Sequence, residues 1–400
     1  MDFNYAIPDG LYKVPDHLLD LRPDSDVDHD IAHPRPVTDE KNVWFFWHSG
    51  FATMHPYGQR TVRAYHRRFS KLGWAIRVVD CAPGSPLHIR NYLDFDDPAT
   101  FPEAFRKGTL SGLYAVQHTS DLVRWPLLLR YGGVYADAGM VQIGDLDRLW
   151  RETIGNPASP YEVISYGTTL QNYFMASNRG NALFARAHKL LLKLWGGRTS
   201  TEGMHADPLL KGVPLVGSDS MAFTENGRTY TGPEVKRMLS DYIIQGQAVK
   251  LVMGLVDDED GWDGPRYCRE HVFAIDFMVG SQLINELTNW DGPRQFELMS
   301  LPLPGEGEAE SADQRRAREI VEQCLTRSFG FKLATGMILR VFGDTLSSLW
   351  RKHVGSDVVV GTYAHWFRVA TANWNQRELP LPLELGGLEV IKRGPLLREV

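Results

Sequence analysis

The stretch SDLVRWPLLLRYGGVYADAG, residues 120–139, carries most of the information about how this chain folds. Its apolar residues recur at helical spacing, and Asp121 and Arg124 lie three residues apart, so both belong to one face of the predicted helix. Pro126 lacks a backbone donor, which predicts either a kink at that point or a helix start close to it. The stretch therefore predicts a helix with an acidic and a basic group near its start.

The second half of this stretch predicts a tight turn into a strand. Gly132 and Gly133 end the helix with a left-handed cap, and Val134 and Tyr135 form a short buried strand. Asp137 follows at the carboxyl end of that strand, where open α/β sheets bind their ligands. The same pattern also fits a purely structural arrangement, a buried ion pair beside a turn carboxylate. Periodicity alone does not decide between this structural interpretation and a functional site.

The composition is that of an ordinary globular enzyme. The 400 residues are 43% hydrophobic and 23% charged, enough for one large core or two domains. The formal net charge of −6 and the lack of a basic cluster argue against a nucleic-acid partner.

The cysteines and the start of the chain bear on its compartment. Cys81, Cys268 and Cys324 are widely spaced and form no CxxC pair, which favours a reducing compartment. The amino terminus shows no basic-then-apolar leader, and Arg124 and Arg130 interrupt the leucine-rich run near residue 127. We expect a cytoplasmic protein with no membrane span.

The order of predicted elements indicates an α/β fold. Residues 1–40, rich in Pro and Asp, predict an extended arm, and residues 41–400 predict one domain. Alternation of strands and helices favours a mainly parallel, Rossmann-type sheet flanked by helices. The elements expected besides residues 120–139 are strands at 43–47, 74–80, 163–167 and 171–177, and helices at 57–73 and 181–197.

A helical or loop insertion is expected around residues 300–355. Residues 301–319 are acidic and punctuated by Pro and Gly, as in a surface loop or the start of a solvated helix. Residues 331–353 carry apolar residues at helical spacing with basic ends. Packing into the core is the commoner cause of that pattern than a membrane-surface or acceptor-binding helix.

Several other polar and aromatic residues are candidates for a site. Asp137 alone could ligate magnesium or manganese with help from substrate phosphates, whereas Asp145 and Asp147 fit the cap and first turn of a short helix. Trp47, at the end of the 43–47 strand, could stack on a planar base. No Walker-type or GxGxxG phosphate loop is present.

These segments together resemble the capsular-polysaccharide-synthesis-type glycosyltransferases, in the wider family of Asp-x-Asp sugar transferases that includes the Golgi initiating mannosyltransferases. SDLVRWPLLLRYGGVYADAG is similar to the family's signature of SD, two residues, Arg, an apolar helix, YGG, a strand and an Asp motif. The order of four further segments agrees: NVWFFWHSG at 42–50, QNYFMAS at 171–177, TGP at 231–233 and AHWFRVATANW at 364–374.

The resemblance implies a GT-A-like fold, a nucleotide-sugar donor, a divalent metal ion (Mn²⁺ or Mg²⁺) and transfer with retention. Asp121 and Arg124 match the positions that hold donor-sugar hydroxyls, Asp137 matches the first Asp of the metal motif, and Trp47 matches the base-stacking position. We also expect Tyr135, on the strand that leads to Asp137, to be one of the donor-binding residues.

The terminal segment and the second motif position complete the comparison. Asn373 and Trp374 resemble a terminal pair near the diphosphate, and His365 resembles a terminal histidine that meets metal or phosphate. Gly139 stands where the motif has its second Asp, so a metal ion would need donor phosphates, water, His365 or Asp145.

The resemblance also implies a mechanism, in which the departing phosphate accepts the proton of a front-side acceptor. The acceptor is expected to be a small cytosolic metabolite, aromatic or lipid-like. Two rivals stay open: a non-catalytic nucleotide- or glycan-binding protein with a degenerate metal site, and a metal-dependent phosphoesterase, which would need more metal ligands than the sequence offers.

Overall fold

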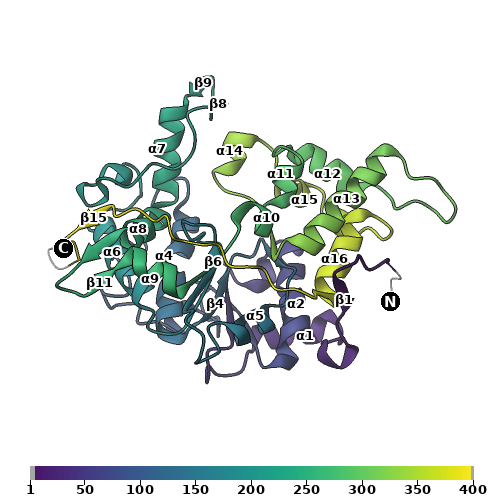
Figure 1. Ribbon diagram of the computed structural model, residues 1–400, viewed down its shortest axis with the longest axis horizontal. Helices are drawn as coiled ribbons and strands as arrows, with labels where there is room; N and C mark the ends of the chain where they lie inside the picture. Colours follow the sequence, from purple (N-terminus) through teal and green to yellow (C-terminus); the bar gives the residue numbers. More distant parts are fainter. Residues whose placement is uncertain (1–4, 398–400) are drawn as a thin grey trace.

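A central six-stranded sheet organises the molecule. The computed structural model, drawn in Figure 1, describes residues 5–397. Its central sheet has the strand order β12-β6-β7-β4-β2-β3. All neighbouring strands pair in parallel except β7, which is antiparallel to both β4 and β6. The strands are β2 (Asn42–Phe46), β3 (Ala75–Val79), β4 (Gly133–Ala136), β6 (Val163–Tyr166), β7 (Phe174–Ser177) and β12 (Val272–Ile275).

Helices cover both faces of this sheet. Successive side chains of β2 point to opposite sides, so Trp44 joins one buried cluster and Phe45 the other. Helices α4 (Ala115–Tyr131), α6 (Ala182–Trp195) and α8 (Ile244–Met253) pack on the Trp44 side. Helices α1 (Asp24–Ala32), α2 (Pro56–Phe69) and α5 (Leu146–Glu152) pack on the Phe45 side. The predicted mixed α/β architecture with a mostly parallel sheet is confirmed.

A third buried cluster, mainly helical, lies beside the sheet (Figure 1). It contains α11 (Leu283–Leu287), α12 (Gly292–Ser300), α13 (Ala312–Arg327), α15 (Leu346–Lys352) and α16 (Tyr363–Asn373). Two small sheets join it: β1 (Leu11–Lys13) with β14 (Trp374–Gln376), and β5 (Met140–Gln142) with β13 (Gly330–Lys332). Residues 301–311 form the expected loop, and a Ser311 capping box then starts α13.

Residues 331–353 do not form the single helix that their apolar spacing suggested. They contain the end of β13, then α14 (Ile338–Phe342) and α15. Gly336 and Gly343 have φ angles of 69° and 75°, a backbone region that favours glycine, and they separate these elements. The apolar residues of this stretch face two clusters: Phe331, Leu333, Leu346 and Trp350 pack in the helical cluster, and Met337 and Val341 pack in a smaller one with Phe223 and Val235.

The amino-terminal segment is less extended than expected. It pairs through β1 with β14 and then forms α1, which packs on α2. The carboxyl-terminal segment, yellow in Figure 1, instead runs across the molecule from α16 to β15 (Lys392–Arg393). The two ends of the chain therefore hold the sheet and the helical cluster together.

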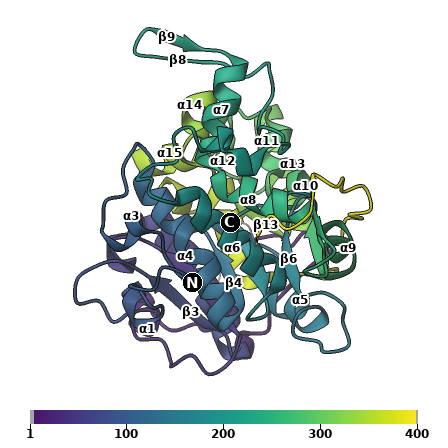
Figure 2. The ribbon, with the colours of Figure 1, turned by 90° about the vertical axis from the view of Figure 1, so that its left-hand side faces the viewer.

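The remaining elements lie around this frame. A hairpin of β8 (Phe223–Glu225) and β9 (Arg228–Tyr230) projects from the body next to α7 (Gly232–Tyr242) (Figure 2). The others are α3 (Glu103–Arg106), α9 (Gly264–His271), α10 (Phe277–Ser281), β10 (Leu255–Asp257) and β11 (Trp262–Asp263). Within residues 5–397, no helix has the length and apolar character needed to cross a membrane. The three cysteines are free thiols.

Candidate active site

A cavity of about 510 Å³ opens at the carboxyl ends of β2 and β4, beside the start of the antiparallel strand β7. We call it the Asp137 cavity. The residues that define it come from five segments of the chain: Trp47, Asp121, Arg124, Asp137, Asn172 and Lys332. The predicted convergence of Asp121, Arg124 and Asp137 on one strand end is therefore present.

The paired glycines bring α4 and β4 close enough to build this site. Gly133 has a φ of +97°, and a Cβ there would lie 2.4 Å from the carbonyl oxygen of Asn42, so β4 can pair with β2 only with glycine at this point. Gly132 has φ 66° and ψ −165°, a conformation almost restricted to glycine but different from the predicted left-handed cap. Pro126 lies inside α4, which begins at Ala115, so of the two alternatives predicted at Pro126, a kink or a nearby helix start, the helix start is wrong.

Asp121 and Arg124 form a buried ion pair that faces the cavity. Asp121 Oδ1 lies 2.8 Å from a guanidinium nitrogen of Arg124, and Arg124 is 3% exposed. The guanidinium also donates to Ser120 Oγ at 2.9 Å and lies 4.7 Å from the ring centre of Tyr135. Burial by itself lowers the pKa of Arg124, but the neighbouring Tyr135 and the two carboxylates raise it above its ordinary value.

The carboxylate of Asp121 is fixed from both sides. Its Oδ1 accepts from Asn172 Nδ2 at 3.1 Å, and its Oδ2 lies 3.2 Å from His118 Nδ1. The Nε2 of Gln245 donates to the backbone carbonyl of Asp121 at 2.9 Å. The buried-ion-pair interpretation and the site interpretation thus describe the same residues, because the pair is both buried and part of the cavity wall.

Asp137 is held between two cations. Its Oδ2 accepts from Lys332 Nζ at 2.7 Å, and its Oδ1 lies 3.7 Å from the guanidinium of Arg124. Its backbone N–H donates to the carbonyl of Tyr173 at 2.8 Å, which fixes the end of β4 against β7. Burial raises the pKa of Asp137, but the charges of Lys332 and then Arg124 outweigh it and leave that pKa below its ordinary value.

Lys332 is the site residue that sequence reasoning missed. It ends β13, which pairs with β5 so that Lys332 lies opposite Met140. This register turns its ammonium toward Asp137, a residue distant in sequence. Residues 331–353 looked like one helix, and no sequence pattern indicated the strand pairing that brings Lys332 here.

The two aromatic candidates lie in different environments. Trp47 directly follows β2, donates its backbone N–H to Val79 and lines the cavity, with its ring 6.0 Å from that of His55. Burial, and then the charge of Arg351, lower the pKa of His55. Tyr135 is 1% exposed and does not line the cavity. It supports Arg124 and bonds to Ser120 Oγ at 2.8 Å.

The terminal candidates lie in a second cavity, of about 820 Å³. We call it the seam cavity, since the amino-terminal segment, α2 and α16 enclose it; His365, Asn373 and Trp374 line it. His365 Nδ1 contacts the hydroxyl of Tyr5, and Trp374 pairs with Lys13 in the β1–β14 sheet. The structure does not bring these residues to Asp137, and their predicted contacts with diphosphate or metal stay predictions.

Comparisons of the sequence with known proteins identify a matching family and several relatives. Residues 24–202 match the family model described as "Capsular polysaccharide synthesis protein". The chain is 30% identical to O-glycosyltransferase braB of Annulohypoxylon truncatum, over 98% of this chain and 94% of that protein. It is 33% identical to glycosyltransferase afumC of Aspergillus fumigatus, over 92% of this chain and 93% of that protein. It is 30% identical to O-glycosyltransferase PaGT of Phomopsis amygdali, over 94% of this chain and 93% of that protein.

The chain belongs to the capsular-polysaccharide-synthesis-type glycosyltransferases. The matched segment of the family model contains Trp47, Asp121, Arg124 and Asp137 but ends before Lys332. The relatives align over nearly the whole chain, so the similarity covers the segments of both the sheet and the helical cluster.

Among the described residues, the side chains around Asp137 do not form a ligand set for the divalent ion that the resemblance implies. Asp137 is the one carboxylate at the motif, and Lys332 already bonds to it. Asp145 caps α5 through Arg148 N and accepts from Asn375, as its helix-cap interpretation predicted, and Asp147 bonds to Lys41 and Arg151. Each of these carboxylates is therefore already bonded within the chain.

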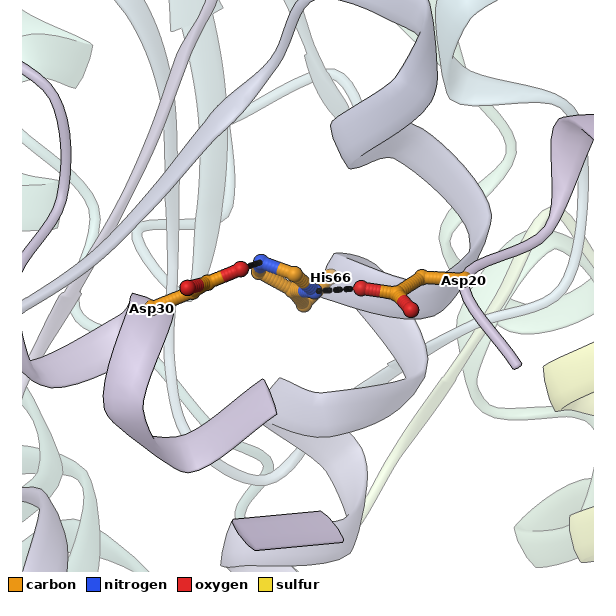
Figure 3. Close-up of side chains that lie close together, drawn as sticks. All are labelled: Asp20, Asp30 and His66. Carbon is orange, nitrogen blue, oxygen red and sulfur yellow. Dashed lines mark ion pairs between the residues drawn. The ribbon is translucent and has the colours of Figure 1, made fainter. Parts of the chain in front are cut away.

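A different cluster has the residue types of a metal site, but both of its carboxylates already bond to an arginine. Asp20, Asp30 and His66 lie together between α1 and α2 (Figure 3). His66 Nδ1 is 3.4 Å from Asp20, and its Nε2 is 3.7 Å from Asp30. Arg22 bridges both carboxylates at 2.6 and 2.5 Å. This cluster fastens the amino-terminal segment to α2.

Proposed function

We propose that this glycosyltransferase moves a sugar from a nucleotide-sugar donor to an acceptor hydroxyl in the Asp137 cavity, with retention at the anomeric carbon and on a GT-A-type sheet. The observation that carries the proposal is the buried Asp121–Arg124 pair, whose polar atoms face a cavity at the carboxyl ends of parallel strands. Charged groups held this rigidly can orient sugar hydroxyls before reaction, which lowers the entropic part of the barrier.

The donor fits the charges and the aromatic group of the cavity. A nucleoside diphosphate is anionic, and the charged residues that line the cavity are three cations (Arg124, Lys332, Arg351) and two carboxylates (Asp121, Asp137). Trp47 lies at the end of β2, where its ring can stack on a base. The relatives named O-glycosyltransferases support a hydroxyl oxygen as the acceptor.

The arrangement of the carboxylates supports front-side attack. Double displacement needs a carboxylate that is free to attack the anomeric carbon. Asp121 is bonded on both oxygens, and both oxygens of Asp137 face cations. The departing phosphate is then the base that accepts the acceptor's proton.

The acceptor proposed is a small aromatic or lipid-like alcohol. The volume of about 510 Å³ is in the range of small-molecule sites. Phe46, Met54, Tyr57 and Tyr242 add apolar and aromatic surface to the wall. Such a wall favours a planar or aliphatic acceptor over a long hydrated polysaccharide.

A screen of common nucleotide sugars, with mass spectrometry to detect donor hydrolysis or transfer, tests this function. We expect turnover of at least one donor, and an α-linked donor should give an α-linked product by NMR. Nucleotide binding without turnover would instead favour a non-catalytic binding protein. Cleavage of phosphate esters without sugar transfer would favour the phosphoesterase.

A further inference from the structure

Lys332 occupies the position beside Asp137 where the family resemblance predicts a divalent cation. Its Nζ is 2.7 Å from Asp137 Oδ2, and its side chain is 12% exposed, with the ammonium on the cavity wall. The same ammonium lies over the ring of Tyr173, 5.0 Å from its centre, a distance at which an aromatic face attracts a cation. The carboxylate of the motif therefore already has a fixed positive partner.

The fold also closes the position of the second motif carboxylate. A Cβ on Gly139 would lie 2.8 Å from the carbonyl oxygen of Leu333, closer than side-chain carbons approach backbone. The N–H of Leu333 donates to the carbonyl of Gly139 at 2.8 Å, extending the pairing of β13 with β5. The same backbone contact that excludes an aspartate at Gly139 delivers Lys332 to Asp137.

A second cation in the cavity has an unused donor. Arg351, on α15, lines the wall, and its buried Nε has no hydrogen-bond partner among the described residues. An unpaired buried donor is costly unless a ligand completes it. With Lys332 and Arg351 on the wall, an anion entering the cavity meets positive charge supplied by the chain itself.

We propose that Lys332 replaces the divalent cation: its ammonium, with Arg351, stabilises the departing diphosphate, and transfer needs no metal ion. This inference rests on the function proposed above. The bond from the anomeric carbon to the phosphate oxygen breaks, and its electron pair stays on that oxygen. The acceptor oxygen forms the new bond to the anomeric carbon, and its proton passes to the released phosphate. Lys332 keeps its proton throughout and supplies charge, while Asp137 is the positioning residue that holds it.

The first experiment removes metal from the purified full chain with EDTA and follows nucleotide-sugar hydrolysis with and without added Mn²⁺. We expect initial rates to agree within about twofold, because fixed donors of the chain can stabilise the developing oxyanion. Loss of the rate on chelation, with recovery on adding Mn²⁺, would overturn the proposal.

The second experiment compares Lys332→Ala and Lys332→Arg with Lys352→Ala, which removes an exposed lysine paired with Asp344. We expect Lys332→Ala to lower kcat about 100-fold or more, Lys332→Arg to retain part of the rate, and the control to match wild type. Equal kcat in wild type and Lys332→Ala would contradict the proposal.

Calorimetric titration with UDP and with GDP in EDTA separates this inference from the proposed function. A protein that hydrolyses no nucleotide sugar under any condition would refute the function. The inference then still predicts that one nucleotide binds in EDTA and binds about tenfold more weakly to Lys332→Ala. Binding that requires Mn²⁺, or no binding of either nucleotide, would overturn it.

Discussion

The Asp137 cavity and the seam cavity are both lined by arginines, but they differ in how those charges are balanced. In the seam cavity Arg63 bonds to Asp24 and Asp28, and Arg67 bonds to Asp24. Among the described residues the other cations of the seam wall are ion-paired as well, whereas Arg351 on the wall of the Asp137 cavity has no ion pair.

The two cavities therefore differ in whether the charges on their walls are already paired within the protein. The paired charges of the seam cavity fasten α1 and α16 to α2, and such pairs are satisfied without a ligand. Arg351, on the wall of the Asp137 cavity, has no such partner among the described residues, and its charge has the sign needed for a diphosphate. Ion pairing, more than cavity size, therefore distinguishes the two cavities, and it favours the Asp137 cavity as the donor site.

The largest effect is expected from Arg124→Ala. This change leaves Asp121 and Asp137 without their shared partner and removes a donor from the cavity wall. We expect kcat/KM for the nucleotide sugar to fall about 1000-fold, since several interactions are lost together. Steady-state kinetics and thermal melting check this. Near-normal kcat/KM in a folded variant would place the chemistry elsewhere.

Asp357→Ala, beside the seam cavity, should have the opposite effect to Arg124→Ala: it should lower stability and leave kcat nearly unchanged. Asp357 is fully buried and pairs with both Arg60 and Arg368, so its loss leaves buried cations unpaired. We expect the free energy of unfolding to fall by about 3–5 kcal/mol, while kcat per folded molecule stays within about twofold. Urea unfolding and active-site-normalised kinetics measure the two quantities. A selective loss of kcat would remove the contrast between the cavities.

The Asp20–Arg22 pair predicts a pH-dependent contribution of the seam to stability. The hydrogen bond from Arg22 lowers the pKa of Asp20 to about 2 from an ordinary value of 3.8. Because the folded-state pKa is the lower one, the pair stabilises fully above pH 3.8 and this contribution is lost as pH falls through about 2. The difference in unfolding free energy between wild type and Asp20→Asn should therefore shrink from pH 5 to pH 2. A difference that grows on acidification would contradict this sign.

The smallest effect is expected for Asp24→Ala. The Asp24 side chain is 59% exposed, its partner Arg63 also bonds to Asp28, and its partner Arg67 also donates to two backbone carbonyls. Solvent and these acceptors therefore replace most of the interaction. We expect a loss of about 1 kcal/mol or less and unchanged kcat. Urea unfolding in low and high salt checks it, and a loss of several kcal/mol would mean that the seam is less evenly paired than described.

The sequence predicted the parts of the site that are contiguous in the chain. Residues 120–139 contain a helix, a glycine turn and a strand end, so their local pattern was enough to bring Asp121, Arg124 and Asp137 together. Asp145 as a helix cap was likewise a local prediction, and it is confirmed.

The parts that were missed depend on contacts between distant segments. Lys332 reaches Asp137 only because β13 pairs with β5 in one register, and a shift by one residue would turn its side chain to the other face. The placement of Trp374 follows from the pairing of β1 with β14. Neither pairing has a pattern of its own in a single sequence.

Hydrogen exchange on the full chain, with and without UDP or GDP, tests most directly that the Asp137 cavity is the donor site. We predict that the nucleotide that binds slows exchange at the backbone amides around Asp121, Asp137 and Lys332 and leaves residues 364–374 unchanged. Protection confined to residues 364–374 and the segment around β1 would place the donor in the seam cavity and contradict the account.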